Sequence, residues 1–443
     1  MSLRRGSAFW LMGGLLGTLM IAAGAPSPLY PVYQATWGFS AVTLTAVFAV
    51  YAVALLAAFL VAGRLSDHLG RKPVIVAALL IEVAAMACFA AADSTGWLYA
   101  ARIVQGIATG TATGAISAAL VDLAPRRNPQ LAPLVNSAAP TLGLATGALG
   151  SSLLLQYGPA PMRLVFWLLL AAFAAGIAGT LAIAEPGQRR PGALASLRPQ
   201  AGIPRPALRA FAAGVPALAA GWALGGLYLA LGPSLAAELL HSSNPVAGGA
   251  VIFLLTGVGA VTSIVCRGWN PPTAMGVGCL LLAVGVGGTV AAIAAGSAAG
   301  FFVGTAFAGT GFGLAFLGVF RTLVALAPPA GRAGLITAIY IVSYLAFSLP
   351  VIAAGIAATH VGLRDTAEVY GLAVAALDVL AAAGLAVGIR RARAGQDAAA
   401  AVSEQAPLPP GVCCPPIGPW EAGEAEGGAA DRRASHFRGD PVG

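Results

Sequence analysis

The segment Gly63-Arg-Leu-Ser-Asp67-His-Leu-Gly70-Arg71-Lys72 is short and charged, and it lies between two long apolar runs, 41–63 and 73–92. Each run has about the 20 residues that an α-helix needs to cross the hydrocarbon core of a bilayer. The pattern therefore predicts a tight polar connection between two membrane-spanning helices.

The composition of the whole chain supports this interpretation. Of the 443 residues, 58% are hydrophobic and 9% are charged, whereas soluble domains carry about 25% charged residues. So few charges could not cover the surface of a soluble fold, and the high hydrophobicity excludes disorder over most of the chain. The net charge of +8 does not indicate nucleic-acid binding, because the Arg residues lie between apolar stretches rather than in one stripe.

Apolar runs of membrane-spanning length recur along the chain, and we predict twelve spans. They cover residues 8–25, 41–63, 73–92, 97–121, 132–156, 163–184, 210–232, 246–265, 274–295, 298–325, 332–358 and 367–389. The fold class expected is therefore an all-α integral membrane protein with twelve transmembrane helices in two six-helix bundles.

The longest internal gap between spans divides six of them from the other six. We expect an N-terminal six-helix bundle at residues 1–184, a cytoplasmic linker at 185–209 and a C-terminal six-helix bundle at 210–390. Residues 391–443 are rich in Ala, Gly, Pro and Glu without a hydrophobic period, so we expect a disordered cytoplasmic tail.

The basic residues predict how the chain is oriented. With the N-terminus inside, the cytoplasmic segments hold nearly all of the loop Arg residues, and the external loops hold Arg163 and Arg364. Because cytoplasmic loops of membrane proteins are enriched in Lys and Arg, we expect a multi-pass protein of the cytoplasmic (inner) membrane with both termini cytoplasmic.

The two halves of the chain share short proline-containing sequences. The first span ends in Ala25-Pro-Ser-Pro-Leu29, and the seventh ends in Gly232-Pro-Ser-Leu235. Repeated halves are common in secondary transporters, where they enclose a site near the middle of the membrane. These sequences therefore favour an internal repeat.

Each polar or glycine position of the charged segment has a physical interpretation. Gly63 lets its helix approach a neighbour closely, and Gly70 permits a tight turn. Asp67 can pair with a cation or with the N-terminus of a facing helix. Arg71 and Lys72 can contact carbonyl groups at helix C-termini or anionic lipid. Such contacts could hold one conformation of the molecule closed.

This segment, between the second and third of twelve spans, resembles the loop signature of the major facilitator superfamily. The resemblance extends over residues 8–390 and implies that Asp67 and Arg71 gate the cytoplasmic side. His68 departs from the family, which usually has Arg or Lys there. The corresponding segment near Arg267 lacks an Asp, so we expect the gating to be asymmetric.

The fourth span contains Leu98-Tyr-Ala-Ala-Arg102-Ile-Val-Gln105-Gly106, which resembles a second motif of the family. A cation inside the membrane is costly and indicates a functional site, and in the family this Arg is tied to proton coupling. Gly106, Gly110 and Gly114 recur every four residues and predict a ridge for close helix packing, to which we also assign Gln105.

In the fifth span, Ala139-Pro-Thr-Leu-Gly143-Leu-Ala-Thr-Gly147 partly resembles the Gly- and Pro-containing motif of antiporters of the superfamily. Pro140 is expected to kink the helix, and Gly143 and Gly147 are expected to pack against a neighbouring span. The resemblance favours export.

Four charged residues in or at the ends of spans are candidates for proton coupling: Arg102, Glu82, Asp122 and Asp378. A low dielectric favours the neutral form of a carboxyl group, which suits a proton carrier. Glu82 and Asp378 lie near the middle of the third and twelfth spans, which the resemblance to the family places at the periphery, so structural pairing is the alternative. Asp122 closes the fourth span at the cytoplasmic side and is expected to pair with the charged segment.

Aromatic and polar residues of several spans suit a broad site for an amphipathic organic compound. The candidate substrate-binding residues are Tyr30, Gln34, Tyr51, Asn136, Trp222, Tyr228, Tyr340 and Tyr344. For the residues between Tyr30 and Trp37, an aromatic belt at the membrane surface is the alternative.

We predict a secondary active transporter that exports a small amphipathic compound by proton-coupled antiport, with alternating access. Its partners would be that substrate, protons and membrane lipid, without nucleic acid, and the protein is expected to be a monomer. We expect no cofactor, no metal and no enzyme activity, since no Walker motif and no Cys/His metal spacing occurs. The alternatives are an uptake symporter or facilitator, and a non-transporting sensor or polytopic membrane enzyme.

Overall fold

The computed structural model describes residues 4–128, 130–187, 191–197, 202–242, 244–328 and 331–405, and every regular element in these ranges is a helix. The chain divides into two compact units, Met1–Arg390 and Arg391–Gly443. All membrane-spanning segments lie in the first unit.

The first half of this unit contains the helices up to α8. In chain order they are α1 (Arg5–Gly24), η1 (Ser27–Leu29), α2 (Tyr30–Trp37), α3 (Ala41–Ala62), α4 (Leu65–Leu69), α5 (Arg71–Ala91), α6 (Thr95–Leu123), α7 (Leu131–Tyr157) and α8 (Leu164–Leu181). A short helix, α9 (Ala193–Ser196), lies in the segment that leads to the second half.

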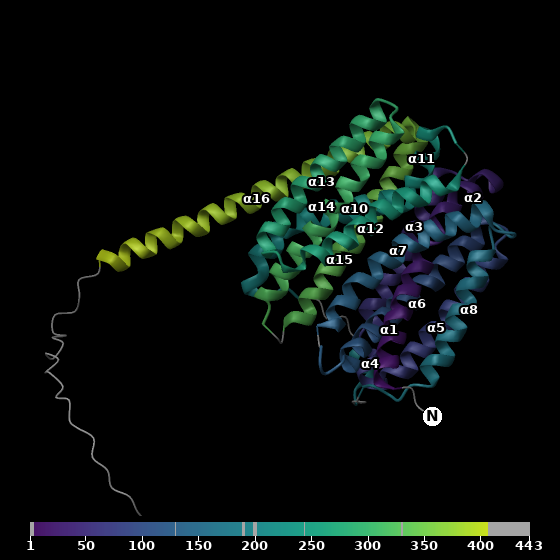
Figure 1. Ribbon diagram of the computed structural model, residues 1–443, viewed down its shortest axis with the longest axis horizontal. Coiled ribbons are helices and arrows are strands. Elements are labelled where there is room, and N and C mark those ends of the chain that lie inside the picture. The colour runs from purple at the N-terminus through teal and green to yellow at the C-terminus, as the bar shows by residue number, and fades with distance from the viewer. Residues whose placement is uncertain are drawn as a thin grey trace, which may run out of the picture. The chain divides into compact units, whose positions relative to one another are not determined.

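The second half contains the remaining helices. They are η2 (Arg205–Ala207), α10 (Leu208–Ala230), α11 (Gly232–Leu240), α12 (Pro245–Val265), η3 (Cys266–Gly268), α13 (Pro271–Ala294), α14 (Ala298–Leu326), α15 (Arg332–Val361) and α16 (Leu363–Gln405). In Figure 1 the purple and blue helices of the first half and the green helices of the second half form two groups.

Twelve of these segments are long and apolar enough to cross a membrane. The prediction of an all-α membrane protein with twelve spans in two six-helix halves is therefore confirmed. Each predicted span overlaps one of the twelve, because an apolar run of this length can satisfy its backbone hydrogen bonds in a bilayer only as a helix.

Further helices follow the first and the seventh predicted spans. Pro26 and Pro28 interrupt the first span, but the chain resumes as η1 and α2. After α10, Pro233 occupies the first turn of α11, where its missing N–H costs no hydrogen bond. Both added helices end in a left-handed residue, Gly38 with φ 67° and His241 with φ 46°. The shared proline sequences thus mark equivalent features of the two halves.

Glycines bring corresponding helices of the two halves together in the same way. A Cβ atom on Gly106 of α6 would lie 2.6 Å from the carbonyl oxygen of Tyr51 in α3, and Gly110 is equally close to Leu55. The second half repeats this contact with Gly309 of α14 against Leu255 of α12. The predicted glycine ridge therefore packs α6 against α3, and it has a counterpart in α14.

We call Gly63–Lys72 the hinge, the end of the bundle where it lies the hinge end, and the opposite end the far end. At the far end, every residue from Ala22 to Tyr30 and from Ala223 to Pro233 is buried. One hydrophobic core there joins the first half to residues of the second, namely Leu227, Leu229, Ala230, Leu231, Ile252, Phe347, Val351 and Ala354. The interface between the halves is therefore closed at the far end.

The second half has a separate core near the hinge end. Its buried members include Phe211, Met275, Leu323 and Leu335, and none of its described members comes from the first half. A contact between the rings of Phe59 in α3 and Tyr340 in α15, with centroids 5.2 Å apart, joins the halves there. The two halves thus share less core at the hinge end than at the far end.

Helix α16 extends beyond its predicted end. Residues 391–405, which the sequence analysis assigned to a disordered tail, are helical up to Gln405. The reason is the high helix propensity of their Ala, Arg and Gln residues. Residues 406–443, the rest of the predicted tail, lie outside the described residues.

Candidate functional site

The hinge is a network of hydrogen bonds around Arg71. Its Nε donates to Asp122 Oδ2 of α6 at 3.1 Å, and its Nη1 donates to Ser66 Oγ at 2.8 Å and to Asp67 Oδ1. Gly70 has a φ of 99°, which an L side chain rarely adopts. The ion pair that the sequence predicted between Asp122 and the charged segment is therefore present, and Asp67 pairs within the hinge itself.

Glu185 and Lys72 connect the hinge to the end of α8. Glu185 Oε1 accepts a hydrogen bond from Arg71 N at 2.7 Å, and Oε2 accepts one from Lys72 N at 3.1 Å. In return, Lys72 Nζ donates to the carbonyl oxygens of Leu181 at 2.6 Å and Ile183 at 3.0 Å. Each charge thus satisfies backbone groups that a helix terminus leaves without partners. Sequence reasoning missed Glu185; an acidic residue directly after the sixth span was the available signal.

The corresponding segment of the second half is held differently. Arg321 Nη1 of α14 donates to the carbonyl oxygens of Arg267 at 2.6 Å and Trp269 at 2.9 Å. In the first half an Arg of the connection bonds a carboxylate of α6, whereas here an Arg of α14 bonds backbone carbonyls of the connection. The two connections therefore differ in their bonding, and asymmetric gating stays a prediction.

A second network surrounds Arg102, whose side chain is fully buried. Its Nε donates to Tyr30 Oη at 2.6 Å, and its Nη1 donates to Gln105 Oε1 at 2.8 Å and to the carbonyl oxygen of Ala23 at 3.2 Å. Its carbon Cζ lies 5.0 Å from the ring centroid of Tyr51. Its Nη2 has no hydrogen-bond partner among the described residues. The cation is thus held in one orientation with one donor group unused.

Gln105 links this cation to a carboxylate. Its Nε2 donates to Glu82 Oε1 of α5 at 3.4 Å and to the carbonyl oxygen of Ala22 at 2.9 Å. Thr109 Oγ1 donates to Glu82 Oε2 at 3.5 Å. We call Tyr30, Glu82, Arg102, Gln105 and Thr109 the buried network. It joins α2, α5 and α6 and connects the guanidinium group of Arg102 to the carboxyl group of Glu82 through Gln105, which the sequence analysis assigned to helix packing.

The second half has a neutral version of this arrangement. Arg102 lies four residues before Gly106 of the ridge, and Thr305 lies four residues before Gly309. Thr305 Oγ1 forms a hydrogen bond of 3.0 Å with Tyr228 Oη, as Arg102 does with a tyrosine in the first half.

The positions of the amide and the carboxylate also differ between the halves. Ala308 replaces Gln105 immediately before the ridge glycine. Gly285 of α13 packs against Ala308, in the way that Glu82 of α5 contacts Gln105. At the equivalent positions of the second half, Thr305, Ala308 and Gly285 therefore stand in place of the buried cation, amide and carboxylate.

The second half instead contributes an aromatic cluster. Trp222 of α10 lies at its centre, with ring centroids 5.8–6.3 Å from its neighbours Phe312, Phe316, Tyr344 and Phe347. Trp222 Nε1 has no hydrogen-bond partner among the described residues. Tyr340 stacks on Tyr344 at 6.2 Å. Trp222, Tyr340 and Tyr344, which the sequence analysis proposed for substrate binding, thus lie together.

Tyr51 lies between the buried network and the aromatic cluster. The centroid of its ring lies 5.0 Å from Cζ of Arg102. The partly buried Tyr344 packs against a small core cluster formed by Ala23, Tyr51 and Leu55. At Tyr51, the buried network of the first half therefore lies next to the aromatic cluster of the second half.

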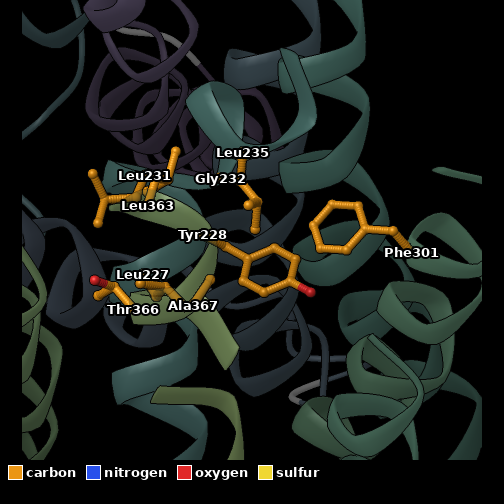
Figure 2. A pocket seen from close by; sticks show the side chains of 9 residues that line it. All are labelled: Leu227, Tyr228, Leu231, Gly232, Leu235, Phe301, Leu363, Thr366 and Ala367. Atoms are coloured by element: carbon orange, nitrogen blue, oxygen red, sulfur yellow. The ribbon is translucent and has the colours of Figure 1, made fainter. Parts of the chain in front are cut away.

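Three other predicted substrate-binding residues lie elsewhere. Gln34 is half-buried on α2 at the far end, and Asn136 Nδ2 donates to the carbonyl oxygen of Ser117 at 3.3 Å. Tyr228 stacks on Phe301 beside a cavity of about 10 Å³ (Figure 2). That volume is at the lower limit for a single water molecule, so this cavity cannot hold an organic substrate.

Asp378 is separate from the other candidate proton carriers. It is fully buried in α16, and neither carboxyl oxygen has a hydrogen-bond partner among the described residues. Asp122 belongs to the hinge, and Glu82 to the buried network. The structure therefore brings Glu82 and Arg102 together and leaves Asp122 and Asp378 apart from them.

The helix-packing residues of α7 contact α1. A Cβ atom on Gly143 would lie 2.6 Å from the carbonyl oxygen of Gly17, and Gly147 is equally close to Ile21. Pro140 lies inside α7, as predicted. This close packing places α7 against the helix that leads to Tyr30.

Comparisons with known proteins were made for sequence and fold. Residues 12–351 match the family model of the Major Facilitator Superfamily. Multidrug resistance protein MdtL of Klebsiella pneumoniae is 35% identical over 122 residues, which are 27% of this chain and 31% of that protein. MdtL of Escherichia coli is 34% identical over 122 residues, 27% of this chain and 30% of that protein. The match thus spans less than a third of these relatives.

Solved structures share the fold at low sequence identity. The human organic anion transporter MFSD10 (TETRAN) is 17% identical with a TM-score of 0.61, over 86% of this chain and 100% of that one. A bacterial homologue of the human lysosomal transporter Spinster, in an inward-facing and occupied conformation, is 14% identical with a TM-score of 0.67, over 87% and 97% of the two chains.

Proposed function

Because the chain belongs to the major facilitator superfamily, and is therefore a multi-pass membrane transporter, we propose that it exports an amphipathic organic compound in exchange for protons. The observation that carries this proposal is the buried network, in which Arg102 and Glu82 are linked through Gln105. The partial similarity to MdtL supports export, since those relatives are multidrug resistance proteins.

Glu82 is the proton carrier in this proposal. An uncompensated charge in the membrane interior is costly, and the carboxylate of Glu82 offsets the charge of Arg102 through Gln105. Protonation of Glu82 removes the negative charge and leaves Arg102 positive, with its Nη2 already without a hydrogen-bond partner in the part of the chain that the structure describes. A conformation in which Arg102 finds water or another acceptor is then favoured, so proton binding shifts the equilibrium between two states.

The substrate lies against the aromatic cluster in this proposal. Trp222 and its neighbours offer flat apolar faces and one N–H group that no described residue accepts from. These groups suit a compound with an apolar ring system and a few polar atoms. Tyr51 separates the cluster from Arg102. In this proposal, the charge of the buried network therefore acts electrostatically on the substrate across Tyr51.

Alternating access follows from the two halves. The interface is closed at the far end, where the halves share one core. With the hinge on the cytoplasmic side of the inner membrane and both termini cytoplasmic, as the Arg distribution predicts, this state is closed to the outside. Rocking of the halves about the central residues then exposes the site to the other side, and the hinge bonds of Arg71 and Asp67 gate that step.

The test is transport by the purified protein in proteoliposomes. A panel of fluorescent amphipathic dyes, ethidium among them, is measured with and without an imposed pH gradient. We expect movement of at least one dye against the direction of the proton gradient, and its loss when a protonophore collapses that gradient. A dye flux that does not depend on the pH gradient would exclude proton coupling. A dye flux in the same direction as the protons would identify a symporter instead.

A further inference from the structure

A groove lies on the outer flank of the first half, next to the hinge. It has a volume of about 650 Å³, within the roughly 300–1,000 Å³ of small-molecule sites. Its lining comes from α5 and from the end of α8 with the residues after it: Lys72, Pro73, Val76, Ala77, Leu80, Leu181, Ile183, Ala184 and Glu185. None of these residues belongs to the buried network or to the aromatic cluster.

The groove is apolar along its length and charged at one end. Leu80 and Leu181 are 55% and 56% exposed, on helices that cross the membrane. From Lys72 to Leu80 the helix rises about 12 Å at 1.5 Å per residue, which fits within the ~15 Å depth of one leaflet. The apolar part of the groove therefore faces lipid hydrocarbon, and its charged end lies at the level of the headgroups.

At the charged end, Lys72 is the group that can hold an anion, because backbone donors already engage the carboxylate of Glu185. Glu185 accepts from the backbone N–H groups of Arg71, Lys72 and Gly187, so backbone donors surround its carboxylate. Lys72 Nζ donates to two carbonyl oxygens, and an ammonium group has three donors. One donor of Lys72, the only lysine of the chain, thus has no partner among the described residues and can bind a ligand in the groove.

We propose that this groove binds an anionic phospholipid from the leaflet at the hinge end, with its phosphate on Lys72 Nζ and an acyl chain along Val76, Leu80 and Leu181. A water-soluble ligand would leave this hydrocarbon-facing wall unused. A phospholipid matches both the apolar wall and the cation at its end.

The site has a consequence for the hinge. Lys72 directly follows Arg71, whose side chain holds Asp67 and Asp122. A bound phosphate takes the Nζ donor that the carbonyl oxygens of Leu181 and Ile183 leave unused, and so adds a contact that holds Lys72 beside Arg71. The lipid composition of the leaflet would then act on the hinge without any contact with the transport site.

Lipid retention by the full-length protein tests this proposal independently of transport. The protein is incorporated into nanodiscs of phosphatidylcholine with phosphatidylglycerol, extracted gently, and examined by native mass spectrometry. We expect the wild type to retain phosphatidylglycerol in preference to phosphatidylcholine. Lys72→Gln should lower that preference about fivefold, the factor expected for one basic residue near a membrane surface.

A second variant tests the groove without changing any charge. Ala77→Trp fills the groove and should abolish retention of phosphatidylglycerol. Val284→Trp is the matched control, because Val284 is 65% exposed on another spanning helix, α13, outside the groove, and it should retain the lipid as the wild type does. Equal retention by Ala77→Trp and Val284→Trp, or an unchanged preference in Lys72→Gln, would overturn the proposal. Failure of proton-driven transport would not affect it.

Discussion

Gln105 occupies the position between the two buried charges of the first half. Its carbonyl oxygen accepts from Arg102, and its amide nitrogen donates to Glu82. A side chain that offers both an acceptor and a donor can face a cation on one side and a carboxylate on the other. An apolar residue of similar size cannot do this, so the link between the charges depends on the amide.

We therefore expect Gln105→Leu to uncouple the charges. The guanidinium group loses a buried acceptor, which costs about 1–3 kcal/mol of stability, and dye transport should fall at least tenfold with a flattened dependence on pH. Unfolding in detergent and transport in proteoliposomes measure the two effects. Thr113→Val is the control, since Thr113 bonds within its own helix. If both variants transport alike with the same pH profile, the link has no role in coupling.

Glu185 makes a separate prediction at the hinge. Its carboxylate caps the N-terminus of α5, and loss of a helix cap typically costs about 0.5–2 kcal/mol. Glu185→Ala should lower the thermal unfolding midpoint in detergent and slow transport. Glu238→Ala should change neither, because Glu238 is exposed on α11 and its side chain has no partner among the described residues. Equal midpoints for the two variants would show that the cap contributes nothing.

Sequence reasoning identified some of these residues and missed others for a physical reason. Arg102 and Glu82 are recognisable because charged groups inside apolar spans are costly. Their connection through Gln105 depends on how α5 and α6 are rotated about their axes, which packing decides. Glu185 lies just outside a span, where a charge costs little free energy, so its presence there does not indicate a functional site. Tyr228 was assigned to the substrate site, yet it bonds Thr305 within its own half.

At the scale of the helices, close packing rests on glycine. Along α6, Gly106 and Gly110 lie against carbonyl groups of α3, and Gly309 and Gly313 of α14 do the same against α12. Backbones can approach this closely only where no side chain intervenes. The pairs α3–α6 and α12–α14 are therefore packed backbone against backbone in the two halves.

Adding one methyl group at this contact tests that conclusion. Gly110→Ala places a Cβ against the backbone of Leu55, and such overpacking typically costs about 1–3 kcal/mol. Gly14→Ala is the control, since nothing lies within 4 Å of a Cβ there; it should be neutral or slightly stabilising. Thermal unfolding in detergent measures both. An unchanged midpoint in Gly110→Ala would mean that the helices can move apart freely.

The extent of the spans was predictable from sequence, but the helices after the first and seventh spans were not. Hydropathy locates a span because the bilayer fixes its length. The segments around Pro28 and Pro233 were interpreted as ends, since proline breaks a helix interior. Proline is tolerated in the first turn of a new helix, and α2 and α11 begin in that way.

At the scale of the whole molecule, the two halves share a framework and differ in chemistry. The first half holds the buried cation, amide and carboxylate, and the second holds Thr305, Ala308 and Gly285 at the corresponding places together with the aromatic cluster. Hydropathy alone does not show which residues of the two halves correspond. The correspondence becomes visible when the glycine contacts of α6 and α14 are aligned, because these contacts show which residues are equivalent.

The direction of the molecule in the membrane is a prediction that labelling can check. In a cysteine-free background, Asn270→Cys reports on the hinge end and Asp93→Cys on the far end, and both positions are exposed. A membrane-impermeant maleimide should label Asp93→Cys in intact cells and Asn270→Cys only in inverted vesicles. The reverse pattern would place the hinge outside the cell.

The most direct test of the central claim compares two kinds of flux in the wild type and in Glu82→Gln. Proteoliposomes measure dye movement driven by a pH gradient, and also exchange of labelled for unlabelled dye without any gradient. The amide of the variant cannot release a proton, so we predict that gradient-driven movement is lost while exchange persists. Gradient-driven movement at the wild-type rate in Glu82→Gln would contradict the assignment of proton coupling to the buried network.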